Sequence, residues 1–232
     1  MAQIVNLPER LRTIVGFIQN GASIIDVGTD HGLLPAYLAQ NGAASHIIAS
    51  DISIGSLGSA HHNAAKYGVT DKITFIEASG LSGIRESDVD TIVIAGMGGE
   101  TIAGILRDAP WTRRSDIRLI LQPQTKLPEL CDFLRQAGYA LQGAKLSLDA
   151  GKLYVIMLVH GGKSDSALAP ELELLARLMH SEDPLLGRYL DELMNRTRRI
   201  LDDMSDSGTP EALDLALKLS VYINMKETLD RG

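Results

Sequence analysis

Short apolar runs and helix-like segments alternate along the first two thirds of the chain. The runs are bounded by polar or glycine-rich turns, which predicts buried strands, and apolar residues recur between them at helical spacing. The expected strands are 24–27, 47–51, 73–76, 91–94 and 117–121. The expected helices are 7–18, 33–39, 54–67, one ending near 107, and 127–137. This alternation predicts an α/β fold with a doubly wound sheet, whose ligand loops lie at the carboxyl ends of its strands.

The alternation stops after the fifth strand. Two strand-like runs, 139–147 and 152–159, flank the short turn Asp149-Ala150-Gly151, which favours an antiparallel pair. We therefore expect five parallel strands followed by one antiparallel pair.

After Gly162 leucine recurs with charged residues, and no strand-like run follows. This pattern predicts helices only, with the last two forming a hairpin whose turn lies at 205–208. The expected helices are 170–180, 184–203 and 210–229. We therefore predict a sheet domain over residues 1–162 and a helical domain over residues 163–232.

Composition is that of a soluble globular protein, with 45% hydrophobic and 22% charged residues. No apolar run approaches the ~18 residues of a membrane span, and charged residues follow soon after Met1, where a signal peptide would be apolar. We therefore expect a cytoplasmic protein with no membrane contact and no obligate protein partner. The net charge of −7 argues against general polyanion binding, although a local basic patch is enough for phosphate contact.

The cysteine and histidine residues do not have the spacing of metal ligands. The single cysteine, Cys131, cannot form an internal disulfide and lies in a helix-like run, so burial is expected. His61 and His62 are adjacent rather than one helical turn apart, which favours a solvated helix face. We expect no metal site.

The stretch from Ile24 to Gly32 has the pattern of a cofactor loop. An apolar strand runs into a turn in which Gly28 and Gly32 permit positive φ and close approach to a ligand. A second strand ends at Asp51, about 20 residues further on, where a nucleotide-binding βαβ unit places the carboxylate for a ribose diol. The two features predict an adenosine-containing cofactor.

An acidic residue discriminates between such cofactors. The dinucleotide fingerprint G-x-G-x-x-G receives a pyrophosphate, but Asp30 takes the place of its middle glycine, and an anion there repels a diphosphate. Asp26, Asp30 and Asp51 instead suit a ligand with an amino group and a sulfonium, which favours S-adenosylmethionine over NAD. The simpler alternative is an ordinary strand–turn–helix in which Asp30 caps the helix.

The other predicted strands also end in polar or glycine-rich residues. These ends are Glu77 to Gly80, a glycine-rich turn at 95–100, and Gln122 to Gln124. Because the carboxyl ends of parallel strands share one rim of the sheet, we expect these segments to meet. Loops at this position are polar by default, so each segment alone is weak evidence.

A basic cluster stands out in the helical part of this acidic chain. Arg196, Arg198 and Arg199 follow Arg188 by two helical turns and are suited to meet phosphates. A solvated helix face explains the cluster almost as well. The leucine stripes beside it are typical of packing or dimerisation.

Three motifs, taken with the predicted hairpin, resemble a known family. They are Asp-Val-Gly-Thr-Asp-His-Gly at 26–32, Ala-Gly-Met-Gly-Gly at 95–99 and Leu-Gln-Pro-Gln at 121–124. Over essentially its whole length the chain is similar to TrmK, the bacterial tRNA adenine-N1 methyltransferases that modify adenine 22 in the D-loop. The first motif alone fits any class I methyltransferase, and its combination with the second is more specific. Where many members carry asparagine, this chain has Gln124.

The resemblance implies a Rossmann-like class I methyltransferase core that uses S-adenosylmethionine, with the hairpin helping to hold tRNA. It implies that Asp51 binds the ribose, that Glu77 and Ala78 flank the adenine, and that Asp26 shapes the methionine end. The full set expected to bind the cofactor is Asp26, Gly28, Asp30, His31, Gly32, Asp51, Ile52, Glu77, Ala78, Gly80, Gly96 and Met97.

The same resemblance suggests which residues act on the target base. Adenine N1 has a lone pair and no proton, so the task is mainly positioning. Asp30 and Gln122 are the catalytic candidates, as groups that accept from the exocyclic amine or stabilise the cationic product. The residues expected to contact the substrate are Gly98, Gln122, Pro123, Gln124, Arg196, Arg198 and Arg199.

Two rival functions remain open at this point. A methyltransferase for a small molecule would use the helices as a lid or dimer interface and would not bind tRNA in a salt-dependent way. A non-catalytic RNA-binding module would bind tRNA without product. An NAD oxidoreductase ranks third because of Asp30.

Overall fold

The computed structural model describes residues 3–204 and 208–231. Its contacts divide the chain into two compact units, one up to Arg177 and one from Leu178 onward. This division lies inside a helix, whereas the sequence places a domain boundary after residue 162; that boundary stays a prediction about domain organisation. Each unit is described by itself below.

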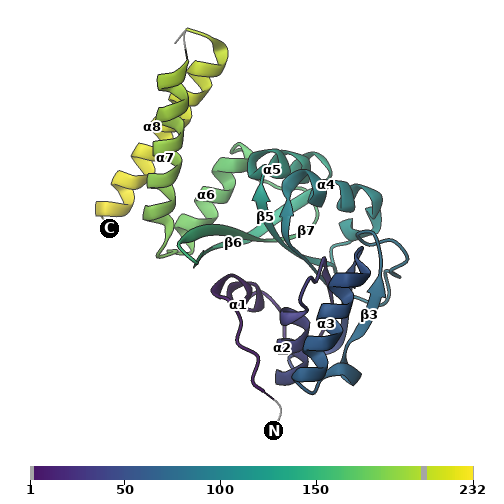
Figure 1. Ribbon diagram of the computed structural model, residues 1–232. Helices are drawn as coiled ribbons and strands as arrows, with labels where there is room; N and C mark the ends of the chain where they lie inside the picture. Colours follow the sequence, from purple (N-terminus) through teal and green to yellow (C-terminus); the bar gives the residue numbers. More distant parts are fainter. Residues whose placement is uncertain (1–2, 205–207, 232) are drawn as a thin grey trace. The chain divides into compact units, whose positions relative to one another are not determined.

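The first unit is built on one mixed sheet (Figure 1). Its strands are β1 (Ala22–Val27), β2 (Ala44–Asp51), β3 (Thr74–Glu77), β4 (Thr91–Gly98), β5 (Arg118–Thr125), β6 (Tyr139–Asp149) and β7 (Lys152–Gly161). They lie in the order β3-β2-β1-β4-β5-β7-β6. Neighbours from β3 to β5 are parallel, and β7 is antiparallel to both β5 and β6. The expected doubly wound sheet with an antiparallel end is therefore confirmed.

Helices cover both faces of this sheet. They are α1 (Glu9–Val15), α2 (Leu33–Asn41), α3 (Ile54–Lys66), α4 (Gly99–Asp108) and α5 (Leu127–Gln136), with short 3-10 helices η1 (Thr70–Lys72) and η2 (Pro110–Arg113). Helix α6 (Pro170–His180) follows the last strand and contains the division between the two units. Figure 1 shows α1, α2 and α3 on one side of the sheet and α4 and α5 on the other. All the expected helices are present within a few residues, and the two 3-10 turns are additional.

The central strands are apolar along their length because helices bury both of their faces. Ile92, Val93 and Ile94 of β4 are fully buried, as is Ile25 of β1, and Ile24 is 1% exposed. The chain leaves β1 toward β2 and β3 and then returns to β4 on the other side. In doubly wound sheets a ligand crevice opens at this reversal, outside the carboxyl ends of β1 and β4.

Two segments expected to be turns continue as strands. β4 runs on to Gly98 through irregular pairing at Met97, and α4 begins directly at Gly99, which corrects the expected turn at 95–100. Likewise Gln122 pairs with Ala95 and Pro123 with Met97, so β5 extends to Thr125. The glycines loosen the ladder without ending it, because β5 still offers backbone partners.

The second unit contains two helices that pack along each other, α7 (Leu186–Asp203) and α8 (Pro210–Arg231). Leu190 and Leu193 of α7 are buried, and Lys226 Nζ of α8 lies 3.1 Å from a carboxylate oxygen of Asp191. The two expected helices are thus confirmed. Most of the turn expected at 205–208 lies outside the described residues, since these omit 205–207. No helix in the described ranges is long and apolar enough to cross a membrane.

Candidate functional site

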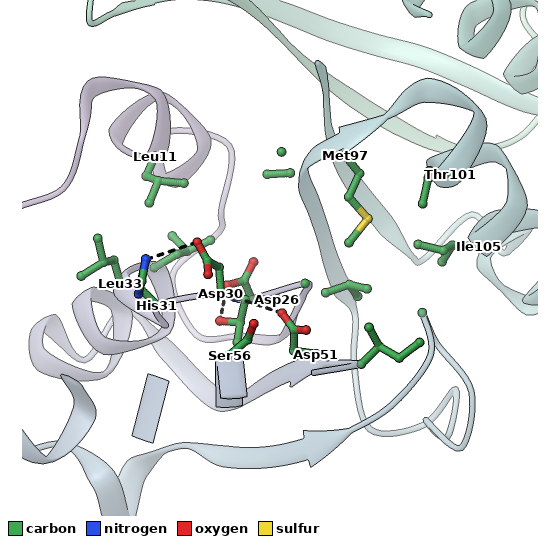
Figure 2. A pocket seen from close by; sticks show the side chains of 18 of the residues that line it. Leu11, Asp26, Asp30, His31, Leu33, Asp51, Ser56, Met97, Thr101 and Ile105 are labelled. Atoms are coloured by element: carbon green, nitrogen blue, oxygen red, sulfur yellow. Dashed lines mark hydrogen bonds and ion pairs between the residues drawn. The ribbon is translucent and has the colours of Figure 1, made fainter. Parts of the chain in front are cut away.

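A cavity of about 680 Å³ opens at the carboxyl ends of β1, β2 and β4. Its wall is formed by the β1–α2 loop, the ends of these strands, the segment after β3, and parts of α1 and α4. Figure 2 shows Leu11 and Leu33 on one side, and Met97, Thr101 and Ile105 on the other. The site lies where the strand order reverses, as the fold predicts.

Three carboxylates gather inside this cavity, those of Asp26, Asp30 and Asp51 (Figure 2). Asp26 is 7% exposed and accepts a 2.7 Å hydrogen bond from Thr29 Oγ1. Burial raises its pKa to about 6, although the Thr29 bond and the charge of Arg10 oppose the shift. Removing this carboxylate from water is therefore only partly compensated, and a cationic ligand group would complete the compensation.

The side chain of Asp51 is hydrogen-bonded to the backbone of Asp30. Asp51 Oδ2 accepts from the Asp30 amide at 3.2 Å, and its Oδ1 accepts from the Ser53 amide at 2.9 Å. The first bond holds the β1–α2 loop against the end of β2, and the second fixes the turn between β2 and α3. Asp30 has a positive φ of 51°, and its exposed carboxylate lies 3.6 Å from His31 Nε2 at the open side of the cavity.

Glycines near the loop have two different uses. Gly28 has a φ of 72°, and a Cβ there would come within 2.3 Å of Met97 Cε, so the glycine permits this backbone conformation and leaves room for the end of the Met97 side chain. Gly32 has a φ of 63° and precedes α2, and a Cβ on it would lie 2.7 Å from the Ala60 Cβ. Gly32 therefore allows α2 to pack on α3. It also occupies the cap position of α2, so the alternative that Asp30 caps this helix is wrong.

A buried amide organises the far wall of the cavity. Gln122 is fully buried, and its Oε1 accepts from Arg10 Nη1 at 2.8 Å and from the Gly96 amide at 3.1 Å. Its Nε2 donates to the Pro123 carbonyl at 2.8 Å. The side chain thus joins α1, β4 and β5. It does not line the cavity, so it positions neighbouring groups rather than contacting a ligand.

Most of the residues expected from the sequence line the cavity. They are Asp26, Gly28, Asp30, His31, Asp51, Ile52, Ala78, Gly80, Gly96, Met97 and Gln124. Others do not, namely Gly32, Glu77, Gly98, Gln122 and Pro123. The side chain of Glu77 is exposed, whereas Pro123 is buried beside β4. Arg196, Arg198 and Arg199 lie exposed on α7 of the second unit.

Several lining residues were not expected from the sequence. Arg10 and Leu11 come from α1, which the sequence marks only as an amphipathic helix before the first strand. Thr101 and Ile105 come from α4 and carry no motif. The glycine-rich segment before α4 signals that this helix begins beside the cavity, but the contribution of α1 has no local signal.

The cavity suits a ligand that is cationic at one end and partly apolar elsewhere. Asp26 offers an undercompensated carboxylate, while Ile52, Leu33 and Met97 give apolar wall. Its volume is in the range of cofactor sites. In the described part of the chain, no three carboxylate, histidine or cysteine side chains are grouped to hold a metal ion. Cys131 is buried away from this cavity, and burial raises its thiol pKa to about 12.

Comparisons with known proteins point in the same direction. A family model described as a methyltransferase domain matches residues 7–157. The tRNA (adenine(22)-N(1))-methyltransferase of Bacillus subtilis is 36% identical over 98% of this chain and 99% of its own length. The crystal structure of the B. subtilis M1A22 tRNA methyltransferase TrmK superposes with a TM-score of 0.79 at 28% identity, covering 96% of this chain and 99% of that one.

A further solved structure contains a ligand. Streptococcus pneumoniae Sp1610 in complex with S-adenosyl-L-methionine has a TM-score of 0.82 and 28% identity, and the match covers 95% of this chain and 100% of that chain. Since these matches span both units of the chain, the similarity is not confined to the sheet.

Proposed function

The chain belongs to the family of tRNA (adenine(22)-N(1))-methyltransferases, and from this membership we propose how its own residues carry out that reaction. The protein is an S-adenosylmethionine-dependent enzyme that methylates N1 of adenine 22 in tRNA. The observation that carries the proposal is the cavity with Asp26, Asp30 and Asp51 at the reversal of strand order. As a tRNA-modifying enzyme, it is inferred to act in the cytoplasm.

The residues present fit S-adenosylmethionine. Asp26 is the carboxylate for the ammonium group, since its raised pKa shows that Thr29 and Arg10 offset its burial only in part. Asp51 is the acceptor for the ribose hydroxyls, at the strand end where this fold binds a ribose. Ile52, Ala78 and Gly80 supply the wall for the adenine. Glu77 is assigned no contact, because its side chain lies outside the cavity lining.

Catalysis in this site is mainly a matter of orientation. When bound, the cofactor supplies a methyl group on a sulfonium, which the lone pair of adenine N1 can attack. The neutral base has no proton at N1, so no side chain must act as a general base before transfer. The chain must therefore exclude water and hold the base, which has to leave its stack to reach the cavity.

Two side chains are placed to receive that base. Asp30 lies exposed at the open side of the cavity, where its carboxylate can accept from the exocyclic amine and offset the positive charge of the methylated ring. Gln124 is exposed on the opposite wall, and its Nε2 lies near Gly96. Gln122 acts through these neighbours by fixing Arg10 and the Gly96 backbone.

Transfer of labelled methyl groups tests this function. The native chain is incubated with labelled S-adenosylmethionine and an unmodified tRNA that has adenine at position 22, beside the same tRNA with guanine there. Label in the first tRNA only is the expected result. Label in neither tRNA, with cofactor binding intact, would move the assignment to a small-molecule methyltransferase.

A further inference from the structure

Four basic side chains of the first unit lie on three elements that pack together beside the cavity. Arg10 and Arg12 belong to α1, Lys145 to β6 and Lys152 to β7. α1 packs against both strands. We call this region, formed by α1 and the β6–β7 hairpin, the α1–hairpin surface.

Aromatic rings hold three of these cations at the surface. Lys152 Nζ lies 5.2 Å and Arg10 Cζ 5.6 Å from the centroid of the Tyr154 ring. Lys145 Nζ lies 5.6 Å from the centroid of Phe17, next to the end of α1. Cation–ring contacts fix the charged groups while leaving their N–H donors available.

These charges are only partly compensated by neighbours. On α1, β6 and β7 the carboxylates are Glu9, which lies 3.7 Å from Arg12, and Asp149, which is opposite Lys152 in register. Among the described residues, Lys145 and Lys152 form no ion pair. Arg10 also interacts with the carboxylate of Asp26 in the cavity wall. Four cations against three anions leave a positive excess here, although the whole chain has a net charge of −7.

The surface is continuous with the wall of the cavity. Arg10 lines the cavity, donates to the buried Gln122 behind its wall and also lies over Tyr154. A nucleotide whose base enters the cavity has its own phosphates at the mouth, so the strand on either side must cross an adjoining surface. Phosphates bind Lys and Arg irrespective of sequence, which suits a contact that positions the RNA.

We propose that the α1–hairpin surface binds the phosphates of the tRNA strand that carries the target adenine, with Lys145 and Lys152 as phosphate contacts. The inference rests on the proposed function. It assigns RNA contact to a part of the first unit that carries no motif in the sequence, in addition to the basic cluster expected on α7. The effect is one of affinity, so tRNA binding changes while the chemical step does not.

Charge reversal tests the proposal with a matched control. In the Lys145→Glu/Lys152→Glu variant, the dissociation constant for tRNA should rise about tenfold or more. The slope of log affinity against log salt should flatten by about 1.4–1.8 when both phosphate contacts are lost, since each neutralised phosphate contributes about 0.7–0.9. The KM for tRNA should rise, with kcat at saturating tRNA and affinity for S-adenosylmethionine within about twofold of native.

The control variant carries the same charge change elsewhere on the first unit. Lys66→Glu/Lys72→Glu alters two exposed lysines outside the α1–hairpin surface, one at the end of α3 and one at the end of η1. Its salt slope should match that of the native chain. Lys145→Gln/Lys152→Gln should lower the affinity for tRNA by an intermediate amount. This variant replaces the charge-reversal variant in the test if charge reversal lowers the thermal midpoint.

The outcomes separate this inference from the function beneath it. If the hairpin variants and the control variant show equal salt slopes while the native chain methylates tRNA, that result would overturn the proposed phosphate binding by the α1–hairpin surface and leave the proposed function standing. A native chain that transfers no methyl group to tRNA would overturn the proposed function instead.

Discussion

Asp26, Asp30 and Asp51 share one cavity, but each carboxylate has different surroundings. Asp26 is buried with a single hydroxyl donor, Asp51 accepts two backbone amides, and Asp30 is exposed next to His31. Hydrogen bonds from backbone amides stabilise a charged carboxylate, whereas burial destabilises it. The three residues are therefore expected to respond differently to substitution.

Asp26→Asn should stabilise the free protein at neutral pH. The pKa of Asp26 is raised from 3.8 to about 6. Between about pH 4 and pH 6 the Asp26 carboxyl group is therefore protonated in the native state and ionised in the unfolded state. Stability contributed by this group is thus present below pH 4 and lost as pH rises through about 6, a cost of about 3 kcal/mol. Asp26→Asn should flatten the pH dependence of the thermal midpoint, while Asp71→Asn, an exposed change, should not.

The same ionisation should govern cofactor affinity. If Asp26 binds the ammonium group as an anion, affinity for S-adenosylmethionine should rise roughly tenfold from pH 5 to pH 7 as the carboxyl group ionises. Asp26→Asn should bind more weakly and lose this dependence. Calorimetric titrations at several pH values would measure both effects, and an unaltered pH profile in the variant would remove Asp26 from this role.

Asp51→Ala should weaken cofactor binding by about 10–100-fold. A hydrogen bond to a charged group contributes about 1.5–3 kcal/mol, and this change also frees the Asp30 amide. Glu77→Ala is the matched control, because Glu77 pairs with Asp51 in register but its side chain lies outside the cavity lining. Calorimetry should show the control within about twofold of native. Equal affinity for Asp51→Ala would exclude the ribose role.

At the scale of the elements, the packing of α2 on α3 positions Gly32, where the β1–α2 loop runs into α2. Gly32→Ala should destabilise the protein by about 1–3 kcal/mol, since its positive φ and the 2.7 Å approach to Ala60 both penalise a side chain. Gly58 lies in the interior of α3 with open space around it. Gly58→Ala should therefore stabilise by about 0.5–1 kcal/mol. Denaturant unfolding of both variants compares the two effects, and equal shifts would contradict this account of Gly32.

The sequence predicts the elements better than it predicts their contacts. Strands such as 91–94 are recognisable because burial on both faces leaves an apolar run, and Gly68, with a φ of 70°, marks the end of α3. The extension of β4 to Gly98 is missed because glycines usually end strands, while here β5 keeps pairing with them.

At the scale of the whole molecule, the sequence again predicts which strand ends form the site better than it predicts the contacts among their side chains. The carboxylates at strand ends were predictable because the fold brings those ends to one rim. Arg10 joins them only through the packing of α1 on β6 and β7 and its bond to Gln122, more than a hundred residues away in sequence. Gln122 was expected to contact the base, and its burial shows why a residue type at a strand end does not settle which way its side chain faces.

The identity of the product tests the central claim most directly. After reaction of the native chain with S-adenosylmethionine and unmodified tRNA, the tRNA is digested to nucleosides and to fragments that contain position 22. Mass spectrometry should find 1-methyladenosine, confined to the fragment with adenine 22. Methylation at the exocyclic nitrogen, at another nucleotide, or on no nucleotide at all would contradict the account of this cavity as a site for adenine N1.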